Sequence, residues 1–129
     1  MSVNYAHADV LDYGLSYIRD NCNKIALIDS YTFGDSYATV VSNMKSFINT
    51  TTSDFTISSV DNDRILTTLE KDDPSAMGTS TSSTRYFAFL DTSVSQVLVV
   101  ISEEYQVSFL QGDLVTYPVL TYRSKQPKQ

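Results

Sequence analysis

The sequence has little of what most enzyme active sites are built from. Its 129 residues include one cysteine, Cys22, one histidine, His7, and no tryptophan. A single cysteine excludes an internal disulfide bond and a metal site made of several thiolates. No apolar run approaches the roughly 20 residues of a membrane-spanning helix, so we expect no membrane partner. The first residues lack the basic and apolar parts of a secretory signal, so we expect synthesis and folding in a cytoplasm.

Positive charge is also scarce. The chain has nine Lys and Arg residues and fifteen Asp and Glu residues, a formal net charge of −6 at pH 7. An acidic surface repels phosphate backbones, so we expect no nucleic-acid partner. Apolar residues make up 42% of the chain and charged residues 19%, as in ordinary globular proteins. The length suits one core, and we predict a single domain over residues 1–129.

What the sequence does contain is a series of short runs rich in β-branched and aromatic residues. Four of them follow one another over residues 85–91, 96–102, 105–113 and 114–122, separated by Ser, Thr, Gly and Asp. This pattern is typical of consecutive antiparallel strands. The second run is apolar on both faces, which indicates a strand covered on both sides by other elements.

An amphipathic helix is predicted at residues 8–22. Leu11, Leu15, Ile18 and Cys22 recur on one stripe with the 3.6-residue period of a helix. Such a stripe usually packs on the domain's own sheet; the alternative is a helix that binds a partner protein. We therefore predict an α+β, mainly β fold: an antiparallel β-sandwich-like domain with an N-terminal amphipathic helix packed on it.

Shorter elements are predicted between the helix and the closing runs, within a β-rich body at 24–122. Residues 71–84 hold little to bury, so we predict a surface loop there. Pro118 lacks an amide donor, which indicates an edge position or a bulge in the last strand. The other predicted elements are a strand at 24–29, a helix capped by Asp35 or Ser36 and ending at Met44, and strands at 47–48, 55–58 and 64–70.

The sequence offers few combinations of residues that could form a catalytic site. A Ser–His–acid triad through His7 would lack the Gly-x-Ser-x-Gly elbow. Cys22 and His7 would lie roughly 22 Å apart along one helix, too far for a hydrogen bond. Cys22 is then either a nucleophile or, as we expect, a buried structural thiol. The segment 61–63 begins like a calcium loop, but Ile65 stands at its fifth position. We predict no catalytic residue, no metal site, no cofactor and no enzymatic activity.

Nine tyrosines and a basic tail at 123–129 are the remaining features. Tyrosine rings at element ends either seal an interface with another protein or complete the rim of a small core. The basic tail has no apolar side chain and could contact the acidic body of a neighbouring copy. An arm is predicted at 1–7. The candidate subunit-contact residues are Tyr5, His7, Tyr31, Tyr37, Met77, Tyr105, Tyr117, Tyr122, Arg123, Lys125 and Lys128.

The order of these segments forms a wider pattern. It runs through residues 11–29, 35–39 and the pair 55–63 and 64–71 to a closing block. The block reads Tyr86-Phe-Ala-Phe-Leu-Asp91, Leu98-Val-Val, Gln106-Val-Ser-Phe-Leu-Gln-Gly-Asp113, Val115, Pro118 and Arg123. This pattern resembles a family of small structural proteins from tailed bacteriophages and prophages. Members of that family usually carry more glycine between strands than the four in this chain.

The resemblance implies a virion component without catalytic activity, foremost a capsid decoration (cement) protein that stabilises the head. It implies the major capsid protein and copies of itself, as a trimer or another symmetric homo-oligomer, as partners. Many weakly bound copies on a lattice would together be retained. A head–tail connector or tail accessory subunit is an alternative within the virion. An alternative of another class is a host-surface or glycan-binding module that uses the tyrosines and residues 71–84.

Overall fold

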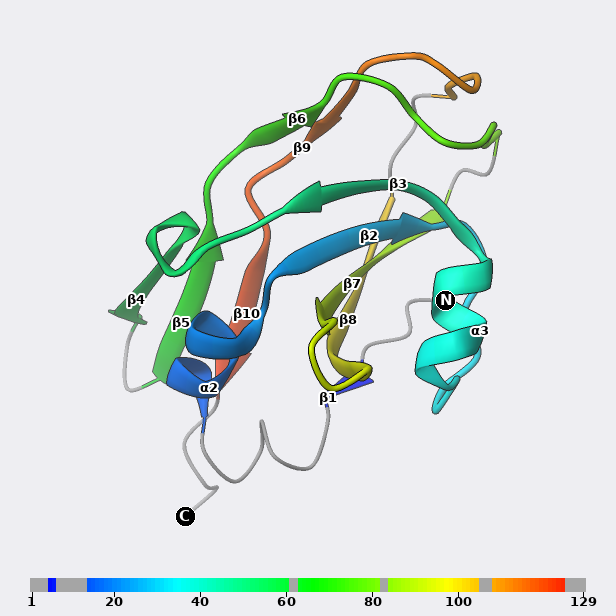
Figure 1. The fold of residues 1–129 in the computed structure, drawn as a ribbon. Coiled ribbons are helices and arrows are strands. Elements are labelled where there is room, and N and C mark those ends of the chain that lie inside the picture. Colours follow the sequence, from blue (N-terminus) through cyan, green and yellow to red (C-terminus); the bar gives the residue numbers. More distant parts are fainter. Residues whose placement is uncertain (1–4, 7–13, 61–62, 82–83, 105–107, 125–129) are drawn as a thin grey trace.

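The structure is a computed structural model that describes residues 5–6, 14–60, 63–81, 84–104 and 108–124. The fold is α+β and mainly β, and all pairings between the described strands are antiparallel. A helix packs on the sheets near the N-terminal side (Figure 1). The predicted fold class is therefore confirmed.

The described strands form three sheets. A five-stranded sheet has the order β1-β8-β7-β2-β3, a three-stranded sheet the order β10-β5-β4, and β6 pairs with β9. The elements are β1 (Tyr5–Ala6), α2 (Leu15–Asn21), β2 (Lys24–Ile28), α3 (Tyr37–Ser42), β3 (Met44–Asn49), the 3₁₀ helix η1 (Thr52–Asp54), β4 (Phe55–Val60), β5 (Asp63–Thr68), β6 (Lys71–Asp73), β7 (Thr84–Asp91), β8 (Gln96–Glu104), β9 (Val115–Tyr117) and β10 (Thr121–Ser124).

The five-stranded sheet is covered on both faces. Ile25 and Leu27 of β2 belong to a core cluster shared with α2, β4 and β5. Ala26 and Ile28, which alternate with them, belong to a second cluster shared with α3. Residues 97–100 of β8 are buried throughout. This confirms the prediction that the run at 96–102 is covered on both sides, because a strand between two packed layers needs apolar side chains on both faces.

Helix α2 packs on the domain's own sheets, as predicted. Its residues Leu15 and Ile18 are buried against the first core cluster, and so is Cys22 at its end. Gly14, just before the helix, has a φ of 74°, a conformation that glycine adopts without steric cost. The start of the predicted helix, residues 8–13, lies outside the described residues.

Helix α3 begins where the sequence predicts. The Ser36 hydroxyl accepts a hydrogen bond from the Thr39 amide at 3.2 Å, which satisfies one of the free donors of the first turn. The helix ends at Ser42, earlier than predicted, because β3 begins at Met44. Val40 is its buried residue and contributes to the second core cluster.

The predicted strands at 105–113 and 114–122 are wrong in part. Residues 105–107 lie outside the described residues, and 108–113 forms a bend in which only Phe109 makes an isolated bridge, to Ser80. The run 114–122 is two strands, β9 and β10, which are interrupted after Tyr117. The interruption contains Pro118, whose missing amide cannot contribute to a ladder.

The predicted surface loop at 71–84 is also wrong in part, although residues 74–79 form no strand or helix and are mostly exposed. Its first three residues form β6, and Thr84 already belongs to β7. Asp73, Ala76 and Ser80 are buried. These side chains are small or polar, so they show no hydrophobic pattern in the sequence. Their cover comes from β9 and residues 108–114, which are distant in the chain.

Candidate functional site

Strands β5 and β6 pair with β10 and β9 as one long antiparallel unit (Figure 1). Thr67 lies opposite Thr121, and Lys71 lies opposite Tyr117. Both chains advance four residues between these pairs, so the register is the same on either side of the gap. We call this unit the ribbon, and it comprises residues 63–73 and 115–124.

Beyond β6 and β9 the two chains stay side by side. Ser80 and Phe109 exchange two backbone hydrogen bonds of 3.0 Å. The amides of Met77 and Gly78 donate to the carbonyl of Lys45 in β3, at 2.9 and 3.1 Å. These bonds hold the end of the ribbon against the edge of the five-stranded sheet. We call this end the tip, and it comprises residues 74–81 and 108–114.

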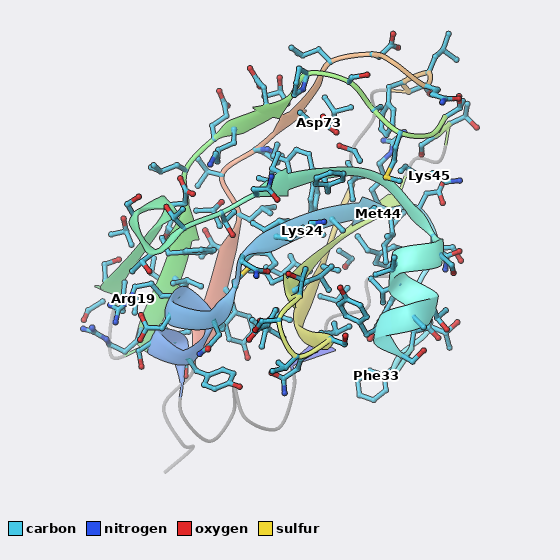
Figure 2. All side chains as sticks on the ribbon, in the orientation of Figure 1. Arg19, Lys24, Phe33, Met44, Lys45 and Asp73 are labelled. Carbon is cyan, nitrogen blue, oxygen red and sulfur yellow. The ribbon has the colours of Figure 1, made fainter. Side chains whose placement is uncertain are left out.

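Most of the exposed large apolar side chains in the described part of the chain lie on the ribbon and the tip. Of seven such residues, only Phe33 and Val94 lie elsewhere, and Figure 2 shows Phe33 pointing away from the protein beside α3. Scattered single residues of this kind are normal, whereas a group on one structural unit marks an interaction surface. The other five, each between 48% and 63% exposed, are Leu69, Met77, Leu110, Leu114 and Val119.

The outer side of the ribbon combines these apolar groups with acidic ones. The continuous register places Leu69 opposite Val119, and Leu114 directly precedes β9. Glu70 and Asp72 are exposed, and neither forms an ion pair with another described residue. We call these five exposed residues, four on the ribbon and Leu114 at its junction with the tip, the ribbon face.

The inner side of the ribbon is anchored by a buried polar chain. The Tyr117 hydroxyl donates to the Ser46 hydroxyl at 2.9 Å, and Ser46 donates to the Asp73 carboxylate at 2.6 Å. The Phe47 amide donates to the same carboxylate oxygen at 3.3 Å. Figure 2 shows Asp73 between the ribbon and β3. Buried polar groups with all partners in place make a joint rigid.

Asp54 forms a second anchor on the same side. Its carboxylate accepts hydrogen bonds from the Thr51 amide at 2.8 Å and from the Lys71 ammonium at 3.1 Å. Burial acts to raise the pKa of Asp54, but the Thr51 amide and Lys71 outweigh it and hold that pKa below its ordinary value. Lys71 thereby connects β6 to the segment before β4.

Arg85 supports the tip from beneath. This side chain of β7 is fully buried, and its Nε donates to the Ser80 hydroxyl at 3.1 Å. Its guanidinium lies 5.4 Å from the centre of the Phe109 ring, within range of a cation–π contact. Both chains of the tip therefore contact one buried cation.

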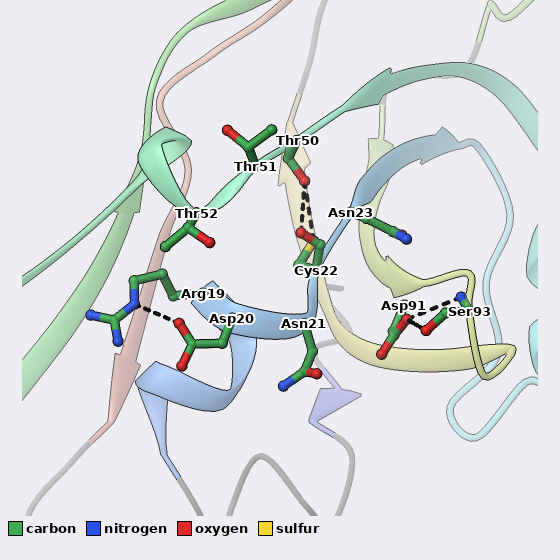
Figure 3. Close-up of a pocket in the computed structure, with 10 residues that line it drawn as sticks. All are labelled: Arg19, Asp20, Asn21, Cys22, Asn23, Thr50, Thr51, Thr52, Asp91 and Ser93. Atoms are coloured by element: carbon green, nitrogen blue, oxygen red, sulfur yellow. Dashed lines mark hydrogen bonds and ion pairs between the residues drawn. The ribbon is translucent and has the colours of Figure 1, made fainter.

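A polar surface pocket of about 300 Å³ lies where α2 meets β2 (Figure 3). Its charged residues are satisfied locally: Arg19 pairs with Asp20 at 3.0 Å, and Asp91 accepts hydrogen bonds from Ser93. Burial raises the pKa of the Cys22 thiol to about 11, so the thiol stays protonated at neutral pH. Cys22 is 3% exposed, which confirms that the thiol is buried.

The described residues also contain no group of three or more His, Cys, Asp and Glu side chains arranged to hold a metal ion. Within the same residues, no helix is long and apolar enough to cross a membrane. Two further pockets of about 250 and 230 Å³ are open and lie near α2 and α3. The ribbon face and the tip are therefore the strongest candidate for a functional site.

Two of the predicted contact tyrosines belong to the core. Tyr117 is 1% exposed and Tyr31 is 7% exposed, so their rings complete the interior and cannot present a surface to a partner. The prediction of contact residues is wrong for both. Tyr37 and Tyr122 are half-buried and pack against the two core clusters, and burial raises the pKa of Tyr122. Met77 is exposed on the tip, where a contact residue is expected.

Of the remaining predicted contact residues, the two that the structure describes lie apart from the tip. Arg123 is exposed in β10, at the opposite end of the ribbon. The backbone of Tyr5 lies in β1, which pairs with β8. Four candidates lie outside the described residues and stay predictions, namely His7, Tyr105, Lys125 and Lys128.

Sequence reasoning missed all five residues of the ribbon face. Leu69 and Glu70 end the predicted strand 64–70, and an apolar residue in a predicted strand is expected to belong to the core. Only the pairing with β9 and β10, about fifty residues later in the chain, turns them outward. The one signal in the sequence was Pro118, which marks the interruption beside Val119.

Comparisons with models of protein families, with curated proteins and with solved structures found no match to this chain. The resemblance to phage structural proteins therefore stays an expectation. The functional argument from the structure rests on the ribbon face and the tip.

Proposed function

We propose that this chain is a non-enzymatic structural protein of a bacteriophage virion, with decoration of the capsid exterior as its role. The observation that carries the proposal is the grouping of five exposed apolar side chains on one rigid ribbon and its tip. A surface of this kind supports contact with other protein subunits rather than chemistry on a small substrate.

The anchoring of the ribbon supports the same role. The Asp73 chain, the Asp54–Lys71 pair and Arg85 join the ribbon and tip to the sheets at three places. A contact surface that is already rigid loses little conformational entropy when it binds. A cement protein needs this property, because each copy contributes little and many copies act together on the lattice.

The phage assignment is supported by the resemblance of the closing block and names the major capsid protein as the partner. The test uses particles assembled without this protein. Added protein is expected to bind them and to raise the temperature at which they release their genome. Leu110→Asp on the tip is expected to weaken binding about tenfold or more, because it places a charge in an apolar contact.

The matched control is Val94→Asp, which puts the same charge on an exposed apolar residue of the β7–β8 turn. It is expected to bind like the unchanged protein. Failure to bind particles, together with absence from virions, would contradict the proposal. Copy number per virion separates the locations: hundreds indicate the capsid and about a dozen or fewer a connector or tail.

A further inference from the structure

We propose that the ribbon face binds the basic tail of a second copy of this chain. This inference rests on the proposed function, because it assigns the ribbon face to contacts between copies and leaves the tip to the capsid. The occupant follows from three observations: the chemistry of the face, the charge of the tail, and the distance between the two within one copy.

The chemistry of the face calls for a partner that is basic and carries methylene groups. In order along the ribbon, the exposed Glu70 and Asp72 come between the Leu69–Val119 position and Leu114. A lysine stem can cover apolar side chains while its ammonium group reaches a carboxylate. Lysines a few residues apart on one segment fit this alternation.

The basic tail is the one stretch of the sequence with this character. Arg123, Lys125 and Lys128 are three of the nine positive residues of the chain, and no Asp or Glu occurs after Asp113. The rest of the chain therefore has an excess of nine negative charges, which is the net charge of −6 without these three cations. Tail and ribbon face are electrostatically complementary.

The tail of the same copy reaches Asp72 only at the limit of its length. Ser124 pairs with Arg64, whereas Asp72 pairs with Thr116, which is eight residues back along the ribbon. At about 3.3 Å per residue this is about 26 Å along the strands. The Cα of Lys128 can lie at most roughly 14 Å from that of Ser124. Even with the lysine and aspartate side chains added, the tail of the same copy spans this distance only when it is fully extended back along its own strand, an arrangement of very low effective concentration. The tail of another copy has no such limit.

Two ribbon faces packed against each other would fit less well. Each would bring Glu70 and Asp72 toward the same carboxylates of its partner, and like charges oppose association. A contact from tail to face is heterologous, because it joins two different surfaces. Contacts of this type close into rings or continue into arrays, which is the geometry that a protein repeated on a shell requires.

The experiment mixes the protein of natural isotope content with heavy-nitrogen protein at low salt and joins carboxylates to amines with a carbodiimide. Mass spectrometry then separates links within one copy from links between copies. The expected result is a link from Glu70 or Asp72 to Lys125 or Lys128 in peptides of mixed isotope content. Its yield is expected to fall as salt is added. Links in unmixed peptides only, or no such link, would overturn the inference.

Variants with a reversed charge test whether the link between copies depends on the ribbon face. Asp72→Lys is expected to lower the yield of the mixed link at Glu70 about tenfold, because it turns an attraction into a repulsion. Mixing this variant with Lys128→Asp protein is expected to restore association. Asp20→Lys on α2 makes the same change in net charge away from the ribbon and is expected to have no effect. An equal loss with Asp20→Lys would show a general charge effect and overturn the inference.

Failure of this inference and failure of the proposed function give different results, because the cross-link is measured without particles. Particle binding without the mixed link refutes the tail contact and leaves the virion role standing. The mixed link without particle binding supports the tail contact and refutes the decoration of capsids.

Discussion

The five-stranded sheet and the ribbon are stabilised in different ways. The sheet lies between two apolar clusters, and its central strands bury both faces. The ribbon buries Leu66, Tyr117 and Leu120 and leaves Leu69 and Val119 exposed. The contacts that fix it in place include a buried serine, a buried aspartate and a buried arginine. Sheet and ribbon therefore share the apolar core, whereas most of the exposed large apolar side chains lie on the ribbon and the tip.

The largest expected effect breaks the sheet. Leu98→Ala in β8 removes a fully buried side chain and is expected to lower the free energy of unfolding by about 2–5 kcal/mol. Leu110→Ala on the tip, where the side chain is 63% exposed, is expected to cost about 0.5 kcal/mol or less. Denaturant titration measures both. Similar losses for the two variants would contradict the contrast between sheet and ribbon.

Measurements of stability at alkaline pH test whether the Cys22 thiol, at the end of α2, is buried. The pKa of Cys22 rises from 9.0 to about 11 on folding, so the protonated thiol favours the folded state. The contribution is fully present below pH 9 and is lost as pH rises through about 11. The loss is about 2–3 kcal/mol. Relative to the unchanged protein, Cys22→Ala is expected to lose this part of the pH dependence. Parallel stability curves would show that the thiol is not buried.

Ser46→Ala tests the polar anchor of the ribbon. It leaves the buried Asp73 carboxylate and the Tyr117 hydroxyl without their shared partner, which is expected to cost about 1–3 kcal/mol. Ser58→Ala, at an exposed position of β4, is the control and is expected to change stability by about 0.5 kcal/mol or less. A neutral Ser46→Ala would mean that apolar contacts alone hold the ribbon.

The smallest expected effect concerns Asp54 and acid. Because its pKa in the folded protein lies below the ordinary 3.8, its ionised form stabilises the fold above that pH. The contribution is lost as pH falls through the lowered value. Asp54→Asn is expected to cost about 1 kcal/mol at neutral pH, as loss of a cap does, and to cost less in strong acid. Thermal unfolding at several pH values measures this, and a pH-independent cost would refute it.

Local patterns were enough to predict much of the sheet and its helices. The apolar runs at 85–91 and 96–102 indicated β7 and β8, and the stripe of Leu15 and Ile18 indicated a helix that packs inward. The role of Ser36 as an N-cap could also be predicted from the sequence. Each of these features depends on neighbours a few residues away, so the periodicity of the side chains carries the information.

The ribbon could not be predicted in the same way. Residues 71–84 contain little apolar material, yet Ala76 and Ser80 are buried because β9 and the segment at 108–114 pass over them. Tyr117 was readable as a surface aromatic and is instead a core residue with a hydroxyl bonded to Ser46. Pairing between distant segments decides these positions.

By itself, then, the sequence determined the fold class, the buried strand β8, the inward-facing stripe of α2 and the burial of its single thiol. All of these follow from local hydrophobic patterns. Only the tertiary structure decided that two segments distant in the chain join as one ribbon. Because a strand pair exposes one side when the other is packed, it also decided which leucines and carboxylates became surface.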